Sequence, residues 1–189
     1  YLELLQTERF LASALTTAFQ TAVFFAMMGF IAYSFERMNI SPKEFGVWMA
    51  TTSVGYVIGN LANKSLLKRY RIEIITLVGA IASLTSLLLM EIWYNAAPNS
   101  PTGLAIPMFL VGLSNGVIIA NSIIIASSAI PRLRGSATGL VGAMQMGAGG
   151  ISGTVAIWLG ADQNTHVGIL TLIVISFCSL LSAWWSSKL

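Results

Sequence analysis

Charged residues are scarce in this sequence. Asp, Glu, Lys and Arg make up 9% of its 189 residues, whereas about 25% is usual for a soluble domain. Hydrophobic residues account for 56%, so a membrane is a better explanation of the composition than a soluble core. The net charge of +3 would suggest nucleic-acid binding in a soluble protein. Here the positions of the few charges matter more than their sum, and no nucleic-acid partner is expected.

Cysteine and histidine each occur once. Because Cys178 is the single cysteine, an intrachain disulfide is excluded. Its location inside the last apolar stretch favours a packing role. His166 has no cluster of other ligands around it in the sequence, and a metal site needs several that converge. We therefore expect neither a metal nor a cofactor.

The sequence also lacks a convincing catalytic motif, and we expect no enzyme. Residues 112–116 match a G-x-S-x-G string, but a nucleophile elbow needs a strand-to-helix turn and this string lies in an apolar stretch. An intramembrane serine protease would pair Ser114 with His166. Ser114 is expected roughly 15 Å below the outer end of its helix and His166 at the rim, so the two are not expected to meet.

Six long apolar stretches dominate the chain. Each approaches or exceeds the roughly 20 residues that a helix needs to cross a bilayer. The run 118–126 is apolar at both odd and even positions, which favours helices over the alternating strands of a barrel. The sequence thus predicts an all-α integral membrane protein, with residues 1–189 forming one six-helix transmembrane unit. The stretches run approximately over 10–33, 45–63, 72–93, 104–130, 136–160 and 167–185.

Lys and Arg are distributed unevenly between the two sides of these helices. If successive helices alternate in direction, Arg37 and Lys43 fall on one side and the other eight on the opposite side: Arg9, Lys64, Lys68, Arg69, Arg71, Arg132, Arg134 and Lys188. The positive-inside rule then predicts a multi-pass protein of the cell membrane with both termini of this segment in the cytoplasm. The loops 64–71 and 131–135 would be cytoplasmic, and 34–44, 94–103 and 161–166 would face outward.

The two halves of the chain share a rhythm of composition. The first helix of each triplet carries polar residues in mid-membrane, the second carries glycines, and the third is nearly all Leu, Ile, Ala and Val. Because three is odd, the second triplet enters the membrane from the opposite side. The pattern predicts two inverted three-helix repeats, which are a construction of transporters. The third helices are expected to face lipid, and the glycine-lined helices to pack closely or slide.

Polar residues at membrane depth usually face a bundle interior or a wet cavity. We predict one shared cavity that binds a small amphipathic molecule, with amides for orientation and apolar side chains for contact. The alternative is that these amides only join neighbouring helices. The candidate substrate-binding residues are Gln20, Phe24, Met28, Asn115, Ser122 and Gln145.

No Asp, Glu, Lys or Arg lies in the middle of an expected helix, so no carrier for proton coupling is evident. Either the protein is not coupled to protons, or the carrier lies on another part. The chain begins with Tyr1 rather than Met, and we expect it to be a piece of a longer polypeptide.

Three groups of residues resemble the C-terminal half of a twelve-helix major facilitator superfamily transporter, close to the bicyclomycin/chloramphenicol-resistance type of drug/proton antiporter. The first comprises 8–11 (ERFL), 24–25 (FF) and 41–46 (SPKEFG). The second, 59–64 (GNLANK) with Lys68 and Arg69, resembles the loop motif G-x-L-a-D-r-x-G-r-k, although Asn63 replaces its acidic residue and Leu66 its second glycine. The third comprises 134–139 (RGSATG) and 142–145 (GAMQ).

This resemblance implies proton-coupled efflux of small amphipathic drugs across a bacterial inner membrane by alternating access. It implies a second six-helix half as partner, either a missing N-terminal half that carries the protonatable residue or a second copy. It also implies that the second helix of each triplet lies between the halves. Candidate gating or inter-half packing residues are Gly59, Asn63, Gly139, Gly142 and Gly149. A solute/proton symporter and a self-contained six-helix homodimer remain alternatives.

Overall fold

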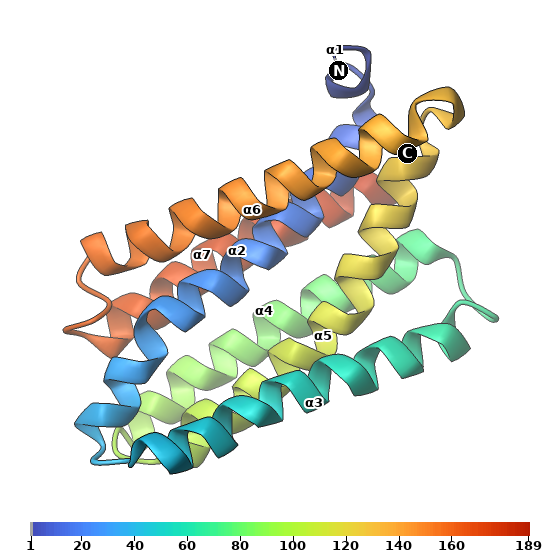
Figure 1. Cartoon of the computed structure of the whole chain (residues 1–189). Coiled ribbons are helices and arrows are strands. Elements are labelled where there is room, and N and C mark those ends of the chain that lie inside the picture. Colours follow the sequence, from blue (N-terminus) through green and yellow to red (C-terminus); the bar gives the residue numbers. More distant parts are fainter. Residues whose placement is uncertain (1) are drawn as a thin grey trace.

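The chain folds entirely into helices in a computed structural model that describes residues 2–189, so Tyr1 lies outside the described residues. Its long helices run roughly alongside one another as a bundle, with a short N-terminal helix at one end (Figure 1). Within residues 2–189 there is no strand, which confirms the predicted all-α fold. The elements are α1 (Leu2–Leu5), α2 (Glu8–Arg37), α3 (Pro42–Leu66), α4 (Ile72–Ala96), α5 (Pro101–Ser128), the 3-10 helix η1 (Pro131–Leu133), α6 (Arg134–Trp158) and α7 (Thr165–Lys188).

Each of the six predicted apolar stretches overlaps one of the helices α2 to α7. By length and composition, five segments are suited to cross a membrane: α2, α4, α5, α6 together with η1, and α7. The predicted span 45–63 in α3 is the exception. Thr51, Thr52, Asn60 and Asn63 interrupt its apolar residues. Thr52 lines a cavity and Asn63 bonds to α5, whereas Thr51 and Asn60 hydrogen-bond within α3.

Local sequence signals set several helix ends. Ser41 and Glu44 form a capping box at the start of α3: Ser41 Oγ accepts from the Glu44 backbone N–H, and the Glu44 carboxylate accepts from the Ser41 backbone N–H. These Ser41 donors hold the pKa of the exposed Glu44 carboxyl below its usual range. At the same end of the bundle, Gly160 follows α6 with φ +92°, a left-handed conformation that favours glycine in the turn into α7.

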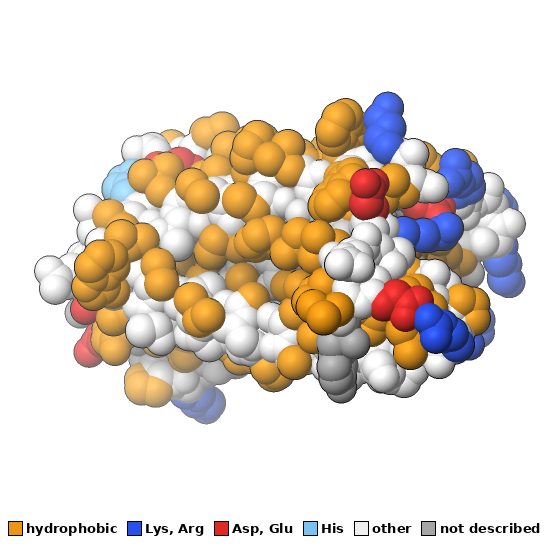
Figure 2. All heavy atoms as spheres, turned by 90° about the horizontal axis from the view of Figure 1, so that it is seen from above, with side chains coloured by type: hydrophobic (Ala, Val, Ile, Leu, Met, Phe, Trp, Pro, Cys, Tyr) orange, Lys and Arg blue, Asp and Glu red, His pale blue; other side chains and the backbone are white. Residues whose placement is uncertain are grey.

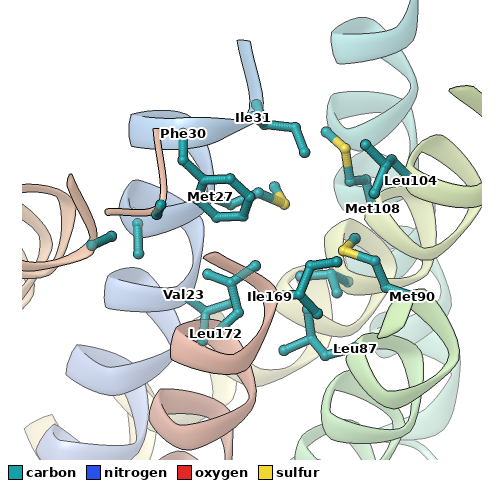
Figure 3. Packing of buried hydrophobic residues seen from close by; sticks show 14 of the residues in the cluster. Val23, Met27, Phe30, Ile31, Leu87, Met90, Leu104, Met108, Ile169 and Leu172 are labelled. Atoms are coloured by element: carbon teal, nitrogen blue, oxygen red, sulfur yellow. The ribbon is translucent and has the colours of Figure 1, made fainter. Parts of the chain in front are cut away.

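The hydrophobic core lies between α2, α4, α5 and α7. Its side chains come from all four helices and point toward one another, as Figure 3 shows for Met27 and Phe30 on α2, Met90 on α4, Met108 on α5 and Leu172 on α7. All five are fully buried. The helix α3 packs mainly on α5 and α6 mainly on α2, and α6 adds Ala156 to the core.

Four glycines bring α3 and α5 into backbone contact. Gly55 and Gly59 on α3 face Gly112 and Gly116 on α5. A Cβ at Gly59 would lie 2.1 Å from the carbonyl oxygen of Leu113, and a Cβ at Gly112 would lie 2.2 Å from that of Thr52. Missing side chains therefore let these two backbones approach as glycines do in other membrane helices.

The predicted lipid-facing helices differ from expectation on one face each. α4 and α7 expose apolar residues such as Val78 and Val174, but their opposite faces are buried and carry serines. Ser186 of α7 shares a hydrogen bond with Ser13 of α2 (2.9 Å), and Ser179 donates to the Thr16 carbonyl (3.1 Å). The sequence does not reveal that these serines are buried, because a serine side chain is small enough to fit either in a helix contact or at the surface.

Charged side chains gather at the two ends of the bundle, and Lys and Arg are concentrated at the end where both termini lie (Figures 1 and 2). At that end Arg9 of α2 pairs with Glu73 of α4 (2.9 Å), and Arg132 pairs with Glu3. At the opposite end Arg37 donates to the Asp162 carbonyl. The two groups of loops that the sequence assigns to opposite sides of the membrane thus lie at opposite ends of the bundle.

Candidate functional site

A cavity of about 410 Å³ opens between α3 and α6, with α2 and α5 behind it. The helices α3 and α6 are not packed against each other, which leaves the cavity accessible from that side. No charged residue lines it. Its walls combine hydroxyls, amides, aromatic rings and aliphatic groups: Thr21 and Phe24 of α2, Thr52, Ser53, Tyr56 and Val57 of α3, Gly112, Asn115 and Ile119 of α5, and Gln145 of α6.

Three of the six predicted substrate-binding residues therefore meet at one cavity: Phe24, Asn115 and Gln145. A fourth, Gln20, lies directly behind it. Its Nε2 donates to Asn115 Oδ1 (2.6 Å) and to Ser83 Oγ on α4 (2.6 Å), so it joins three helices in a buried network. The network fixes the orientation of the Asn115 amide at the cavity wall.

Gln145 holds the α6 side of the cavity. Its Nε2 donates to Thr17 Oγ1 (2.9 Å) and Thr21 Oγ1 (3.1 Å), both on α2. Gln145 is only partly buried and keeps contact with the open space. One amide thus both links α6 to α2 and presents a polar group to the cavity, which combines the two roles that the sequence leaves as alternatives.

Some polar atoms at this site have no partner within the described residues. Thr52 Oγ1 lines the cavity and is buried without a hydrogen bond, and Gln20 Oε1 is likewise buried and unsatisfied. An unpaired polar atom in an apolar setting is costly. A ligand or water carrying a donor would satisfy such an acceptor at the cavity wall.

The other predicted site residues lie elsewhere. Met28 packs against the hydrophobic core. Ser122 is fully buried, and its Oγ has no hydrogen-bond partner within residues 2–189. Neither residue lines the cavity.

The predicted gating residues divide into two groups. Gly59 and Asn63 face α5 of the same chain, where Asn63 and Asn121 exchange reciprocal amide hydrogen bonds of 2.8 and 3.0 Å. Gly149 packs against the Phe25 ring on α2. Gly139 and Gly142, in contrast, have open space where a Cβ would lie.

Sequence reasoning missed the α3 wall of the cavity. Thr52, Ser53 and Tyr56 are spaced so that they share one helix face, and this spacing could have identified them. Ser83 was also missed, because a single serine in an apolar helix carries no pattern.

At the end opposite the termini, His166 forms a separate cluster. Its Nδ1 lies 2.8 Å from Glu91 Oε1, and its ring packs edge-on against Tyr94 with centroids 4.8 Å apart. Ser114, which an intramembrane serine protease would pair with His166, donates its hydroxyl to the Leu110 carbonyl of its own helix. No group of three or more His, Cys, Asp or Glu side chains suited to a metal occurs within residues 2–189.

The sequence matches a known protein family over most of its length. Residues 10–188 match the Major Facilitator Superfamily. The chain belongs to this superfamily. No curated protein sequence matches the chain significantly.

Members of the major facilitator superfamily are membrane transporters, and this membership identifies the chain as a multi-pass membrane protein of a transport family. The match extends over all six long helices, including α3. For a major facilitator protein, an uncharged polar cavity between helices is a candidate place for a transported molecule.

Proposed function

We propose that this chain is the C-terminal half of a transporter that exports small amphipathic drugs in exchange for protons by alternating access. The observation that carries the proposal is the cavity between α3 and α6, where Asn115, Gln145 and Phe24 come together from three helices. Two amides can orient a ligand, while the Phe24 and Tyr56 rings provide apolar contact.

Helix packing supports two inverted repeats, α2–α4 and α5–α7. The second and third helices of the first triplet, α3 and α4, pack on α5, the first helix of the second triplet. In the same way α6 and α7 pack on α2. Each triplet thus wraps the leading helix of the other, as two equivalent units related by an in-plane axis would.

A second six-helix unit, in the same polypeptide or as a second copy, would close the open side of the cavity. The exposed faces of α3 and α6 support this part of the proposal, since Gly139 and Gly142 have no neighbour at the Cβ position. Small residues on a free helix face permit close approach of another helix. The proton-carrying carboxylate would then lie in the second unit.

The cavity chemistry supports a narrower class of transported molecule. Because no lining residue is charged, this half favours a neutral molecule or a cation held by ring faces. The membrane is proposed to be a bacterial inner membrane, with both termini of this segment in the cytoplasm.

Transport in proteoliposomes tests the function. The full-length polypeptide is reconstituted, a pH gradient is imposed, and the fluorescent cation ethidium is followed. Antiport predicts that ethidium moves against the proton flux and that a protonophore abolishes its accumulation. Movement of a neutral solute together with protons would instead support a symporter, which the hydroxyl and amide groups of the lining would also suit.

A further inference from the structure

A second hollow lies on the outside of the bundle, between α3 and α4 with α5 as its floor. Its volume is about 360 Å³, and its exposed lining is apolar throughout. Leu66 and Tyr70 border it at the α3–α4 turn, Ile74 and Val78 continue along α4, and Leu113 and Val117 form the floor. This apolar groove is separate from the cavity between α3 and α6.

The groove ends at a cluster of free positive charges. Lys68 and Arg69 lie between Leu66 and Tyr70, and Lys64 lies one turn of helix earlier. All three are exposed, and none forms an ion pair within residues 2–189. Arg71, the next basic residue, is drawn instead toward Glu73 (3.5 Å).

Backbone hydrogen bonds close this charged turn. The amides of Arg69 and Tyr70 both donate to the Leu66 carbonyl, at 2.9 and 3.0 Å. Lys68 and Arg69 therefore belong to a hydrogen-bonded turn whose flanking residues, Leu66 and Tyr70, line the groove. An aromatic residue such as Tyr70 at this position is typical of the boundary between hydrocarbon and headgroups.

We propose that the groove binds one acyl chain of an anionic phospholipid whose phosphate is held by Lys68 and Arg69. The dry lining suits a hydrocarbon chain: Ser114, its one hydroxyl-bearing residue apart from Tyr70, already donates to the Leu110 carbonyl. Basic pockets between transmembrane helices bind anionic headgroups in other membrane proteins. Charge at the mouth and an apolar channel behind it together match a phospholipid better than a neutral lipid.

Lipid retention tests the charge. The full chain is purified in dodecylmaltoside, dioleoyl phosphatidylglycerol or dioleoyl phosphatidylcholine is added, and bound lipid is counted by native mass spectrometry. The wild type is expected to retain phosphatidylglycerol preferentially. Lys68→Gln with Arg69→Gln should reduce that preference about tenfold. The matched control, Arg134→Gln with Lys188→Gln, removes two charges from the same end of the bundle and should leave it unchanged.

Photo-cross-linking locates the lipid without any substitution. Phosphatidylglycerol with a diazirine on its acyl chain is expected to label Ile74 to Ala82 in preference to the exposed face of α7. An unchanged lipid preference in the Lys68/Arg69 variant, an equal loss in the control variant, or labelling spread evenly over α4 and α7 would each overturn the proposal and indicate ordinary annular lipid.

Discussion

At the scale of single residues, buried amides and glycines make the main specific contacts between helices. Gln20, Asn115 and Gln145 were identifiable from sequence because a polar side chain at membrane depth is unusual. The partner Ser83 was not identifiable, since it is a single small residue in an apolar helix. Met28 packs against the core and does not line this cavity, and its position along α2 alone does not reveal which neighbouring helix it meets.

Gln20→Ala should destabilise the chain. The substitution removes two interhelical hydrogen bonds and leaves the Asn115 and Ser83 acceptors without their donor. A loss of about 1–2 kcal/mol is expected, measured as a lower midpoint in a thermal-stability assay in detergent. Asn95→Ala is the control, because Asn95 is exposed and bonds only within its own helix. Equal midpoints for both variants would contradict the network.

The Asn63–Asn121 pair should show strong coupling. Asn63→Leu alone leaves Asn121 buried with an unsatisfied amide, whereas the double substitution with Asn121→Leu removes both polar groups. The double variant is therefore expected to be more stable than the single one, with a coupling energy on the order of 1 kcal/mol. Additive effects in a double-mutant cycle would show that the reciprocal bonds contribute nothing.

At the scale of helices, the sequence predicted where elements lie better than which faces they bury. Long apolar runs locate helices because only they satisfy their backbone in lipid. Which glycine meets another backbone depends on packing. Gly79, on a helix expected to face lipid, has Ile118 within 2.8 Å of its Cβ position, while Gly142 on the glycine-rich helix faces open space.

Gly59→Ala should impair folding far more than Gly142→Ala. A methyl group at Gly59 would meet the Leu113 carbonyl oxygen at 2.1 Å, and backbone atoms cannot move aside without separating α3 from α5. At Gly142 the methyl group meets nothing within 4 Å, and the gain in helix propensity is up to about 1 kcal/mol. Yield of monodisperse protein after size-exclusion chromatography measures the difference. Similar yields would contradict the close α3–α5 packing.

At the scale of the whole molecule, the distribution of charge agrees with a single orientation in the membrane. The all-α architecture followed from composition and length of the apolar runs. The sequence predicted only part of the cavity lining, because the contribution of α3 depends on how α3 crosses α5. The four glycines set that crossing together, with a G-x-x-x-G spacing in each helix. The spacing in α3 does not by itself reveal that α5 is the partner.

Cysteine labelling tests the orientation. In a Cys178→Ser background, Ser65→Cys lies in the last turn of α3 and Asn99→Cys lies in the turn before α5, at opposite ends of the bundle. We expect a membrane-impermeant maleimide added to intact cells to label Asn99→Cys alone, because Lys and Arg concentrate on the Ser65 side. Labelling of both from outside, or of Ser65→Cys alone, would contradict this orientation.

The central claim is that the cavity between α3 and α6 binds the transported molecule. Its most direct test is efflux of a panel of amphipathic compounds by cells expressing the full-length polypeptide with Asn115→Ala or Gln145→Ala, beside Asn95→Ala as control. We expect the two cavity variants to show altered preference among compounds, with protein abundance near that of the control. An unchanged compound profile accompanied only by lower abundance would mean that these amides merely hold the helices together, and would contradict the claim.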